Sequence, residues 1–160
     1  MGKLISRKEY EDLVANLPEG YCPFCKVENQ IVLGDSEYWV WIAALSPYWR
    51  YHTLLVPRRH MLDISDISAD EFKDLKKLYG EIVKHLLTLN LKHEDGKTLN
   101  QFIFMIRTRE KEFQDDSAYY KPDHLHIHIS PDREGVGRFN LDEFAIDVDI
   151  EKIAFKHNKF

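Results

Sequence analysis

The feature that most constrains this chain is the segment from His124 to Ile129, in which histidines alternate with aliphatic residues. An alternation with a period of two predicts a β-strand, because successive side chains on a strand point to opposite faces. The three histidines are expected on one face, and the three aliphatic residues anchor the other face in a core. A single histidine on a strand is commonly a tolerated polar residue, whereas three in register indicate a functional site.

The spacing of these histidines decides what kind of site they can form. Residues two apart on a strand lie about 6.5–7 Å apart, so the outer pair, His124 and His128, would be about 13 Å apart. One metal ion cannot bind both side chains at that separation. We therefore interpret the row as donors, acceptors and nucleophiles that face an extended anionic substrate, with His126 in the middle.

Two helices are predicted from their start signals. Ser6 and Ser68 each stand three residues before a glutamate, which is the spacing of a capping box. They predict a short helix over 7–16 and a long helix that ends near Leu89. The apolar stripe of the long helix is expected to pack in the core and consists of Phe72, Leu75, Leu78, Tyr79, Ile82, Val83 and Leu86.

Four further segments are rich in β-branched, aliphatic and aromatic residues and are predicted to be strands, over 30–33, 37–43, 52–56 and 101–107. Turns are expected at Gly34-Asp35 and Asp95-Gly96. Strands before and after a long helix predict an antiparallel sheet with helices packed on it, which is an α+β domain. The acidic tail after Pro131 is expected to form a late strand over 144–150 or to pack on a neighbour.

Length and composition limit the class of protein. The 160 residues suffice for one domain with a core and are too few for two, so residues 1–160 are expected to form a single domain. A net charge of -5 argues against a general nucleic-acid binder. No apolar run reaches the roughly 18 residues of a membrane span, and no signal-peptide core precedes the domain. With two cysteines, a disulfide framework is not expected, and the expected location is the cytoplasm.

Cys22 and Cys25 stand in the pattern Cys-Pro-Phe-Cys, which is the usual half of a tetrahedral zinc site. His60 follows a predicted strand and His124 begins the histidine strand. These two are the candidates for the remaining ligands if the other two histidines of the row do the chemistry. Two other interpretations stay open. The cysteines could be a redox pair, although no long helix follows them as in thioredoxin-like proteins, or they could be two inert thiols.

Taken together, these motifs resemble the histidine triad (HIT) superfamily. The segment from His124 to Pro131 is similar to the family's triad, and the segment from Pro47 to His60 is similar to its proline, histidine, strand and "VP-basic-basic-H" stretch. The Cys-x-x-Cys pair is similar to that of the zinc-bearing members and of galactose-1-phosphate uridylyltransferases. The resemblance covers roughly 21–131, leaves 132–160 as a tail, and implies an antiparallel sheet of about five strands with one long and one or two short helices.

The resemblance implies a nucleotidyl hydrolase or transferase. His126 would attack the α-phosphorus of a nucleoside phosphate or phosphoramidate and form a covalent nucleotidyl-histidine, with its other ring nitrogen held as a donor by a backbone carbonyl. His128 and His52 would contact phosphate oxygens. The implied site for a structural zinc ion consists of Cys22, Cys25, His60 and His124.

Two places depart from the family pattern. Ala44 stands where many members carry an asparagine, and Tyr119–Pro122 replaces a Gly-Gln-Ser/Thr stretch that supplies a polar side chain to the phosphate. Lys121 is the candidate for that substrate contact, with Tyr120 as the alternative. The uridylyltransferase branch usually carries a glutamine at the position of His128, so that activity is disfavoured.

The sequence therefore predicts a hydrolase of nucleoside phosphoramidates or dinucleoside polyphosphates. The alternatives are a nucleotidyltransferase or phosphorylase of the same superfamily, and a catalytically weak regulatory module that binds nucleotides. The expected partner is a nucleotide or dinucleotide substrate, and binding to nucleic acid or to a membrane is not expected. The resemblance also implies a homodimer, and Tyr48, Trp49 and Tyr51 could form its interface or a wall that stacks on a base.

Overall fold

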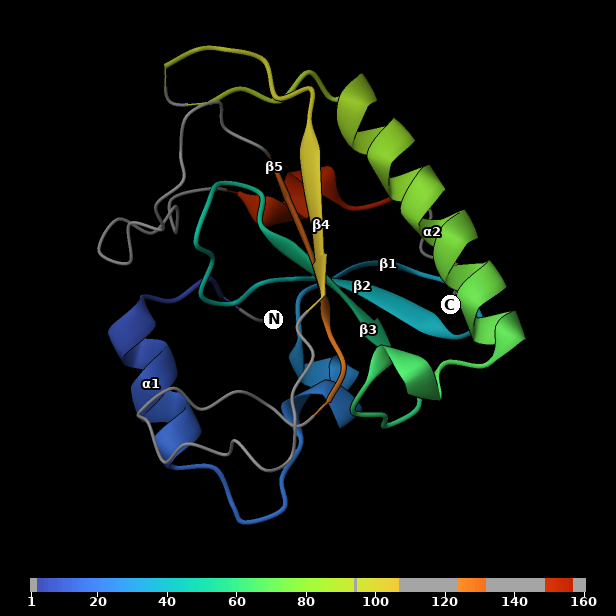
Figure 1. Ribbon diagram of the computed structural model, residues 1–160. Helices are drawn as coiled ribbons and strands as arrows, with labels where there is room; N and C mark the ends of the chain where they lie inside the picture. Colours follow the sequence, from blue (N-terminus) through green and yellow to red (C-terminus); the bar gives the residue numbers. More distant parts are fainter. Residues whose placement is uncertain (1–2, 94, 107–123, 132–148, 157–160) are drawn as a thin grey trace.

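The computed structural model describes residues 3–93, 95–106, 124–131 and 149–156 and shows an α+β fold (Figure 1). Its antiparallel sheet has five strands in the described residues, in the order β1-β2-β3-β5-β4. The strands are β1 (Val32–Asp35), β2 (Trp39–Ala43), β3 (Thr53–Pro57), β4 (Phe102–Ile106) and β5 (Ile127–Pro131). The α-helices are α1 (Arg7–Ala15) and α2 (Ala69–Thr88). The predicted fold class is confirmed, and both helices begin with the predicted capping box.

The histidine strand lies inside the sheet, because β5 pairs with β3 on one side and with β4 on the other. The strand begins at Ile127, so His124 to His126 precede it as extended chain. Both of its faces are buried, which differs from the predicted half-buried strand. The histidine face is covered because Phe24 packs there with apolar side chains of β2 and β3, among them Leu54, the residue paired with His128.

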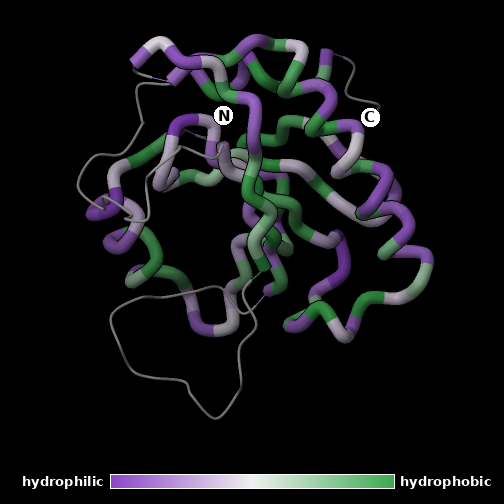
Figure 2. Tube along the Cα trace, turned by 45° about the horizontal axis from the view of Figure 1, so that its top comes forward, coloured by the Kyte–Doolittle hydropathy of each residue, from purple (hydrophilic) through white to green (hydrophobic). Residues whose placement is uncertain are grey.

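The long helix α2 covers the opposite face of the sheet, and hydrophilic and hydrophobic segments alternate along it (Figure 2). Its buried aliphatic residues are Leu75, Leu78, Ile82 and Leu86, which share one core with Ile127 and Ile129 of β5. The prediction for Phe72 is wrong, because 56% of this residue is exposed. Glu71 occupies the buried position at that level of the helix instead. No helix in the described ranges is long and apolar enough to span a bilayer.

The first hairpin and the tail both differ from the prediction, and they pack against each other. Gly34-Asp35 lies inside β1 and is not a turn, and the bend follows at residues 36–38. Phe155 packs directly on Gly34, where its ring occupies the space that a Cβ atom would need. The tail reaches this position through a 3-10 helix, η5 (Ile150–Ile153), whose isoleucines are buried in the main core. A late strand therefore does not extend to Ile150, and residues 144–148 lie outside the described part.

Candidate functional site

Four metal-binding side chains from three distant segments meet at one end of the sheet. Cys22 directly precedes the 3-10 helix η1 (Pro23–Cys25) and Cys25 is its last residue, while His60 follows β3 and His124 precedes β5. Their ligand atoms all lie within 4.8 Å of one another. The structure thus brings together the four residues that the sequence proposed as a metal site.

The distances in this Cys2His2 cluster suit a tetrahedral ion. Nδ1 of His124 lies 3.3 Å from Sγ of Cys22 and 3.5 Å from Sγ of Cys25, and Nδ1 of His60 lies 3.3 Å from Sγ of Cys25. With Zn–S bonds of about 2.3 Å and Zn–N bonds of about 2.1 Å, a tetrahedron places sulfur and nitrogen about 3.6 Å apart. Two thiols and two imidazoles are also the donor set that zinc prefers, so the residues fit this ion.

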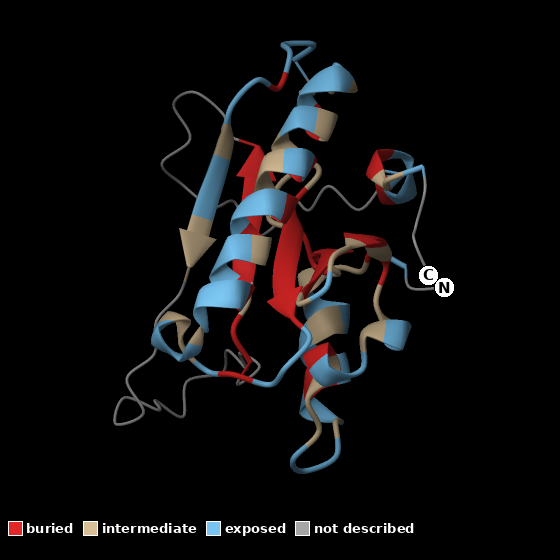
Figure 3. Cartoon of the chain, turned by 90° about the vertical axis from the view of Figure 1, so that its right-hand side faces the viewer, coloured by how far each residue is buried: buried red, intermediate tan, exposed pale blue. Residues whose placement is uncertain are grey.

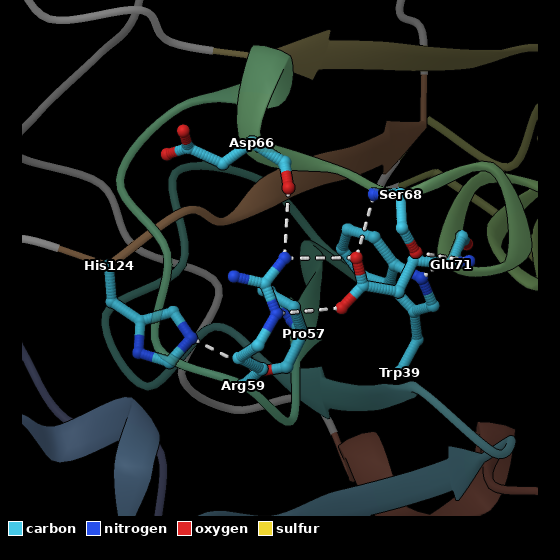
Figure 4. Close-up of polar contacts among 7 residues, drawn as sticks. All are labelled: Trp39, Pro57, Arg59, Asp66, Ser68, Glu71 and His124. Atoms are coloured by element: carbon cyan, nitrogen blue, oxygen red, sulfur yellow. Dashed lines mark hydrogen bonds and ion pairs between the residues drawn. The ribbon is translucent and has the colours of Figure 1, made fainter.

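His124 is held in the tautomer that a metal ligand needs. Its Nε2 lies 3.0 Å from the carbonyl oxygen of Pro57 and donates a hydrogen bond to it, so Nδ1 carries the lone pair that faces the thiols (Figure 4). Burial lowers the pKa of His124 to about 4, which keeps the ring neutral at physiological pH. A second-sphere carbonyl and a neutral ring are both properties of a metal-binding histidine.

The surroundings of the two thiols differ from those of a redox pair. Desolvation and the hydrogen bond and like charge of Cys22 raise the pKa of the Cys25 thiol to about 11. A bound metal ion would deprotonate a thiol that coordinates it. The chain after Cys25 forms a second 3-10 turn, η2 (Val27–Asn29), where a thioredoxin-like motif requires a long helix. The local structure therefore favours the metal interpretation over the redox one.

His126 has one nitrogen tied to the backbone. Its Nδ1 lies 2.8 Å from the carbonyl oxygen of His124 and donates to it, as the resemblance implied. In the neutral ring, Nε2 therefore carries the lone pair. The side chain is half-buried, and its ring centroid lies 5.1 Å from that of His128 and 5.3 Å from that of Phe24. The His126 ring therefore lies beside a second imidazole and the aromatic ring of Phe24.

His52 and His128 form a second pair of imidazoles. The backbone N–H of Tyr48 donates to Nδ1 of His52 at 3.2 Å, so the proton of the neutral ring is on Nε2. That nitrogen lies 2.9 Å from Nδ1 of His128, which accepts its hydrogen bond. His128 consequently carries its own proton on Nε2. Both residues are buried, and the two rings are stacked with centroids 5.1 Å apart.

One residue beside the histidines, Phe24, was not predicted from the sequence as part of the site. Phe24 contacts the rings of both His124 and His126, and the apolar position between two cysteines was the only signal for it. Tyr51 has a φ of 61°, an uncommon value for a residue with a Cβ atom, directly before His52. Lys121 and Tyr120 lie outside the described residues, so their predicted contact with the substrate remains a prediction.

The aromatic residues before His52 support the imidazole pair. The Tyr48 ring stacks on the His52 ring with centroids 5.5 Å apart, and the Trp49 ring meets the same imidazole edge-on at 5.7 Å. Tyr51 packs against the main core. All three are half-buried. In this structure Tyr48 and Trp49 therefore act as walls of the histidine site.

Comparison with known proteins places these features in a family. The model of the HIT domain matches residues 26–135. A comparison with curated protein sequences found no match. Among solved structures, a Zn-bound histidine triad family protein from Mycobacterium smegmatis is 22% identical and has a TM-score of 0.55, over 82% of this chain and 86% of that one.

Two further solved structures share the fold. Diadenosine triphosphate hydrolase from Plasmodium falciparum is 20% identical with a TM-score of 0.51, over 76% of this chain and 67% of that one. A galt-like protein from Arabidopsis thaliana is 18% identical with a TM-score of 0.60, over 92% of this chain and 46% of that one. At these identities the likeness shows the fold alone.

Proposed function

The chain belongs to the HIT family, and on that premise we propose that it is a nucleotide hydrolase with a covalent nucleotidyl-histidine intermediate. The substrate class is a nucleoside phosphoramidate or a dinucleoside polyphosphate. The observation that carries this proposal is the hydrogen bond from Nδ1 of His126 to the carbonyl of His124, which leaves Nε2 as the nucleophile. The Plasmodium falciparum neighbour, a diadenosine triphosphate hydrolase, supports the choice of substrates to test.

The reaction proceeds in two displacements at the α-phosphorus. Nε2 of His126 donates its electron pair to phosphorus while the bond to the leaving group breaks. A leaving amine departs with the bonding electrons and takes a proton from solvent, whereas a leaving nucleoside phosphate departs as an anion. A water oxygen then attacks phosphorus, the P–N bond breaks, and the water proton goes to solvent. The products are a nucleoside monophosphate and an amine, or a nucleoside monophosphate and the remaining nucleotide.

The second imidazole pair stabilises the charge that develops on the phosphate. The proton on Nε2 of His128 is the donor to a non-bridging oxygen, because Nδ1 of this ring accepts from His52. His52 acts through His128, because its Nε2–H donates to Nδ1 of His128 and so holds the tautomer of that ring. Lys121, which precedes the triad in sequence, is proposed as a further contact to the phosphate.

We further propose that Cys22, Cys25, His60 and His124 bind one structural zinc ion. The donor set, the distances and the Zn-bound neighbour from Mycobacterium smegmatis support this assignment. A bound ion would cross-link the segment around η1 to β3 and β5. A site with two thiolates needs reduced cysteines, which agrees with a protein of the cytoplasm.

A homodimer is proposed at the outer edge of β4. This strand is the last of the described sheet, and it exposes Ile103 and Phe104 by 39% and 37% (Figure 3). An exposed apolar edge strand is a template for pairing with another chain. A second copy that pairs there would continue the sheet across the two-fold axis of the dimer.

We also propose that residues 1–160 form a single HIT-like domain, since the described part of the tail packs into the main core.

The experiment that tests the enzyme is intact-protein mass spectrometry after rapid mixing with adenosine 5′-phosphoramidate or a diadenosine polyphosphate. The wild-type protein is expected to gain the mass of one nucleotidyl group transiently, and His126→Ala is expected to gain none. Nucleotide binding without any adduct or turnover would favour the regulatory module. Turnover that requires phosphate or a sugar phosphate as acceptor would favour the transferase, because both reactions share the same intermediate.

A further inference from the structure

A buried carboxylate connects helix α2 to the loop that carries the metal ligand His60. Only 6% of Glu71 is exposed, and its two oxygens accept from Nε and Nη2 of Arg59, each at 3.0 Å. The same carboxylate accepts from the backbone N–H of Ser68 at 2.8 Å, as part of the capping box (Figure 4). One side chain therefore caps a helix and forms a bidentate ion pair.

Both partners of this ion pair are fixed at further points. The backbone carbonyl of Glu71 accepts from the indole N–H of Trp39 at 2.8 Å, which ties the start of α2 to β2 (Figure 4). Nη2 of Arg59 also donates to the backbone carbonyl of Asp66 at 2.9 Å. The Arg59 guanidinium is thus held against a rigid part of the fold, although half of its side chain is exposed.

The loop that follows β3 is exposed at residues 58–60, the part that leads to His60. Arg58, Arg59 and His60 are all exposed, and they stand between two backbone groups that are tied to the histidine segment. On one side the Pro57 carbonyl accepts from His124, and on the other the Met61 carbonyl accepts from Leu125 N–H at 2.7 Å. Between these two points, Arg59 is the side chain that joins the loop to α2.

We propose that the Arg59–Glu71 pair is a positioning clamp that holds His60 in place for metal binding. This inference rests on the proposed metal site and concerns the chain's own residues around it. His60 is the exposed histidine of the Cys2His2 cluster, and its backbone follows Arg59 directly. Without the clamp, the loop must be ordered when the metal binds, and that ordering entropy weakens the affinity.

The geometry favours this pair over the neighbouring one. Arg59 and Glu71 form a bidentate contact in which the carboxylate is buried and shared with the helix cap, so each partner has little freedom to move. Arg58 also forms an ion pair, with Asp35, and its Nε donates to the carbonyl of Ser36 at 3.2 Å. Those contacts join the loop to the first hairpin and not to α2. Arg58 is therefore a matched control.

The test is a measurement of Zn²⁺ affinity by competition with a chromophoric chelator, using the full chain and well below the unfolding temperature of each variant. Arg59→Ala and Glu71→Gln are expected to weaken the affinity roughly 10- to 100-fold, as is usual for outer residues of a metal site. Arg58→Ala is expected to retain the wild-type affinity. The double variant should lose no more than either single variant, because both remove one contact.

A spectroscopic readout separates a displaced ligand from a general loss of stability. The visible spectrum of Co²⁺ reports the number and type of its ligands, and it is expected to change in Arg59→Ala but not in Arg58→Ala. Equal affinities and spectra in wild type, Arg59→Ala and Arg58→Ala would overturn the clamp while leaving the metal site intact. Absence of Zn²⁺ and Co²⁺ binding in the wild-type protein would instead overturn the metal site itself and the clamp with it.

Discussion

The carbonyl oxygen of His124 accepts a hydrogen bond from Nδ1 of His126 at 2.8 Å, while the ring of His124 faces the cysteines. One residue thus contributes its side chain to the proposed metal site and its backbone to the proposed nucleophile. Because His124 takes part in both contacts, we expect a displacement of His124 to shift the ring of His126 as well. The Cys2His2 cluster and His126 are therefore directly linked.

Removing a thiol is expected to affect both the Cys2His2 cluster and His126. Cys22→Ser should abolish the binding of about one zinc ion per chain, lower the unfolding temperature and slow formation of the nucleotidyl adduct, because His124 loses one of its two thiol neighbours. Metal analysis of protein purified without chelator and thermal unfolding measure these effects. His93→Ala, which changes a histidine outside the cluster, should keep the wild-type metal content. A wild-type protein without metal would refute the prediction.

His52 and His126 should differ in how much activity survives their loss. His52→Ala removes the partner that holds the tautomer of His128, and we expect adduct formation to slow about 100-fold, the usual effect of losing one charge-stabilising donor. His126→Ala removes the nucleophile and should form no adduct. Rapid-mixing mass spectrometry compares the two variants directly. An unchanged rate in His52→Ala would show that His128 does not depend on this contact.

The Glu71 carboxylate should make stability sensitive to acid. The hydrogen bonds from Arg59 and from Ser68 N–H lower the pKa of Glu71 from 4.5 to about 2. Its contribution is therefore complete above about pH 5 and disappears as the pH falls towards 2. Glu71→Gln should be less stable than wild type by roughly 1–3 kcal/mol at neutral pH, and the two stabilities should converge in acid.

Urea unfolding at a series of pH values from 7 to 2 measures this convergence. Glu81→Gln changes an exposed glutamate of the same helix and serves as the control, with a pH profile parallel to that of wild type. A constant difference between Glu71→Gln and wild type across the whole range would mean that the ion pair does not link acid titration to stability.

The contact between Gly34 and the tail should be sensitive to one methyl group. A Cβ atom on Gly34 would overlap Cδ2 of Phe155, so Gly34→Ala should displace the tail and destabilise the fold by roughly 1–3 kcal/mol. Phe155→Ala in the same chain should remove most of the added penalty. Gly80→Ala, where nothing lies within 4 Å, should stabilise α2 by roughly 0.5–1 kcal/mol. Chemical denaturation measures the stability of the two single variants and the double variant, which form a double-mutant cycle with wild type, and of Gly80→Ala as the control.

A charge on the edge strand should disrupt the proposed homodimer. Ile103→Lys and Phe104→Lys place an ammonium group on the outer edge of β4, which opposes pairing with a second copy. Sedimentation at micromolar concentration should show monomers for both variants and dimers for wild type. Leu87→Lys changes an exposed leucine of α2 and should remain dimeric. A monomeric wild-type protein would rule out the dimer.

Local patterns were sufficient to predict the elements of this fold. The capping boxes at Ser6 and Ser68 form as predicted, because a cap depends only on residues three apart in sequence. The alternation around His126 correctly anchors Leu125, Ile127 and Ile129 in the core. Element boundaries moved by a few residues, because cross-strand partners decide where a strand starts and ends.

The prediction of burial was wrong where a residue distant in sequence lowers the free-energy cost of burying a side chain. Glu71 is buried and Phe72 is exposed, although hydrophobicity alone predicts the opposite. A carboxylate can be buried only when a cation and hydrogen-bond donors accompany it, and Arg59 arrives from the loop after β3. The sequence around Glu71 does not predict that Arg59 is its partner.

The sequence by itself determined which residue types could do the chemistry: alternating histidines, a Cys-x-x-Cys pair and two more histidines as candidates. Only the tertiary structure decided how they work together. The pairing of β3 with β5 sets Leu54 opposite His128, and the His128 ring contacts the His52 ring near the start of β3. Three segments that are distant in sequence also meet, which places His60 and His124 beside the cysteines. The reason is physical: side-chain direction follows local chain geometry, whereas distances between segments follow from packing of the whole core.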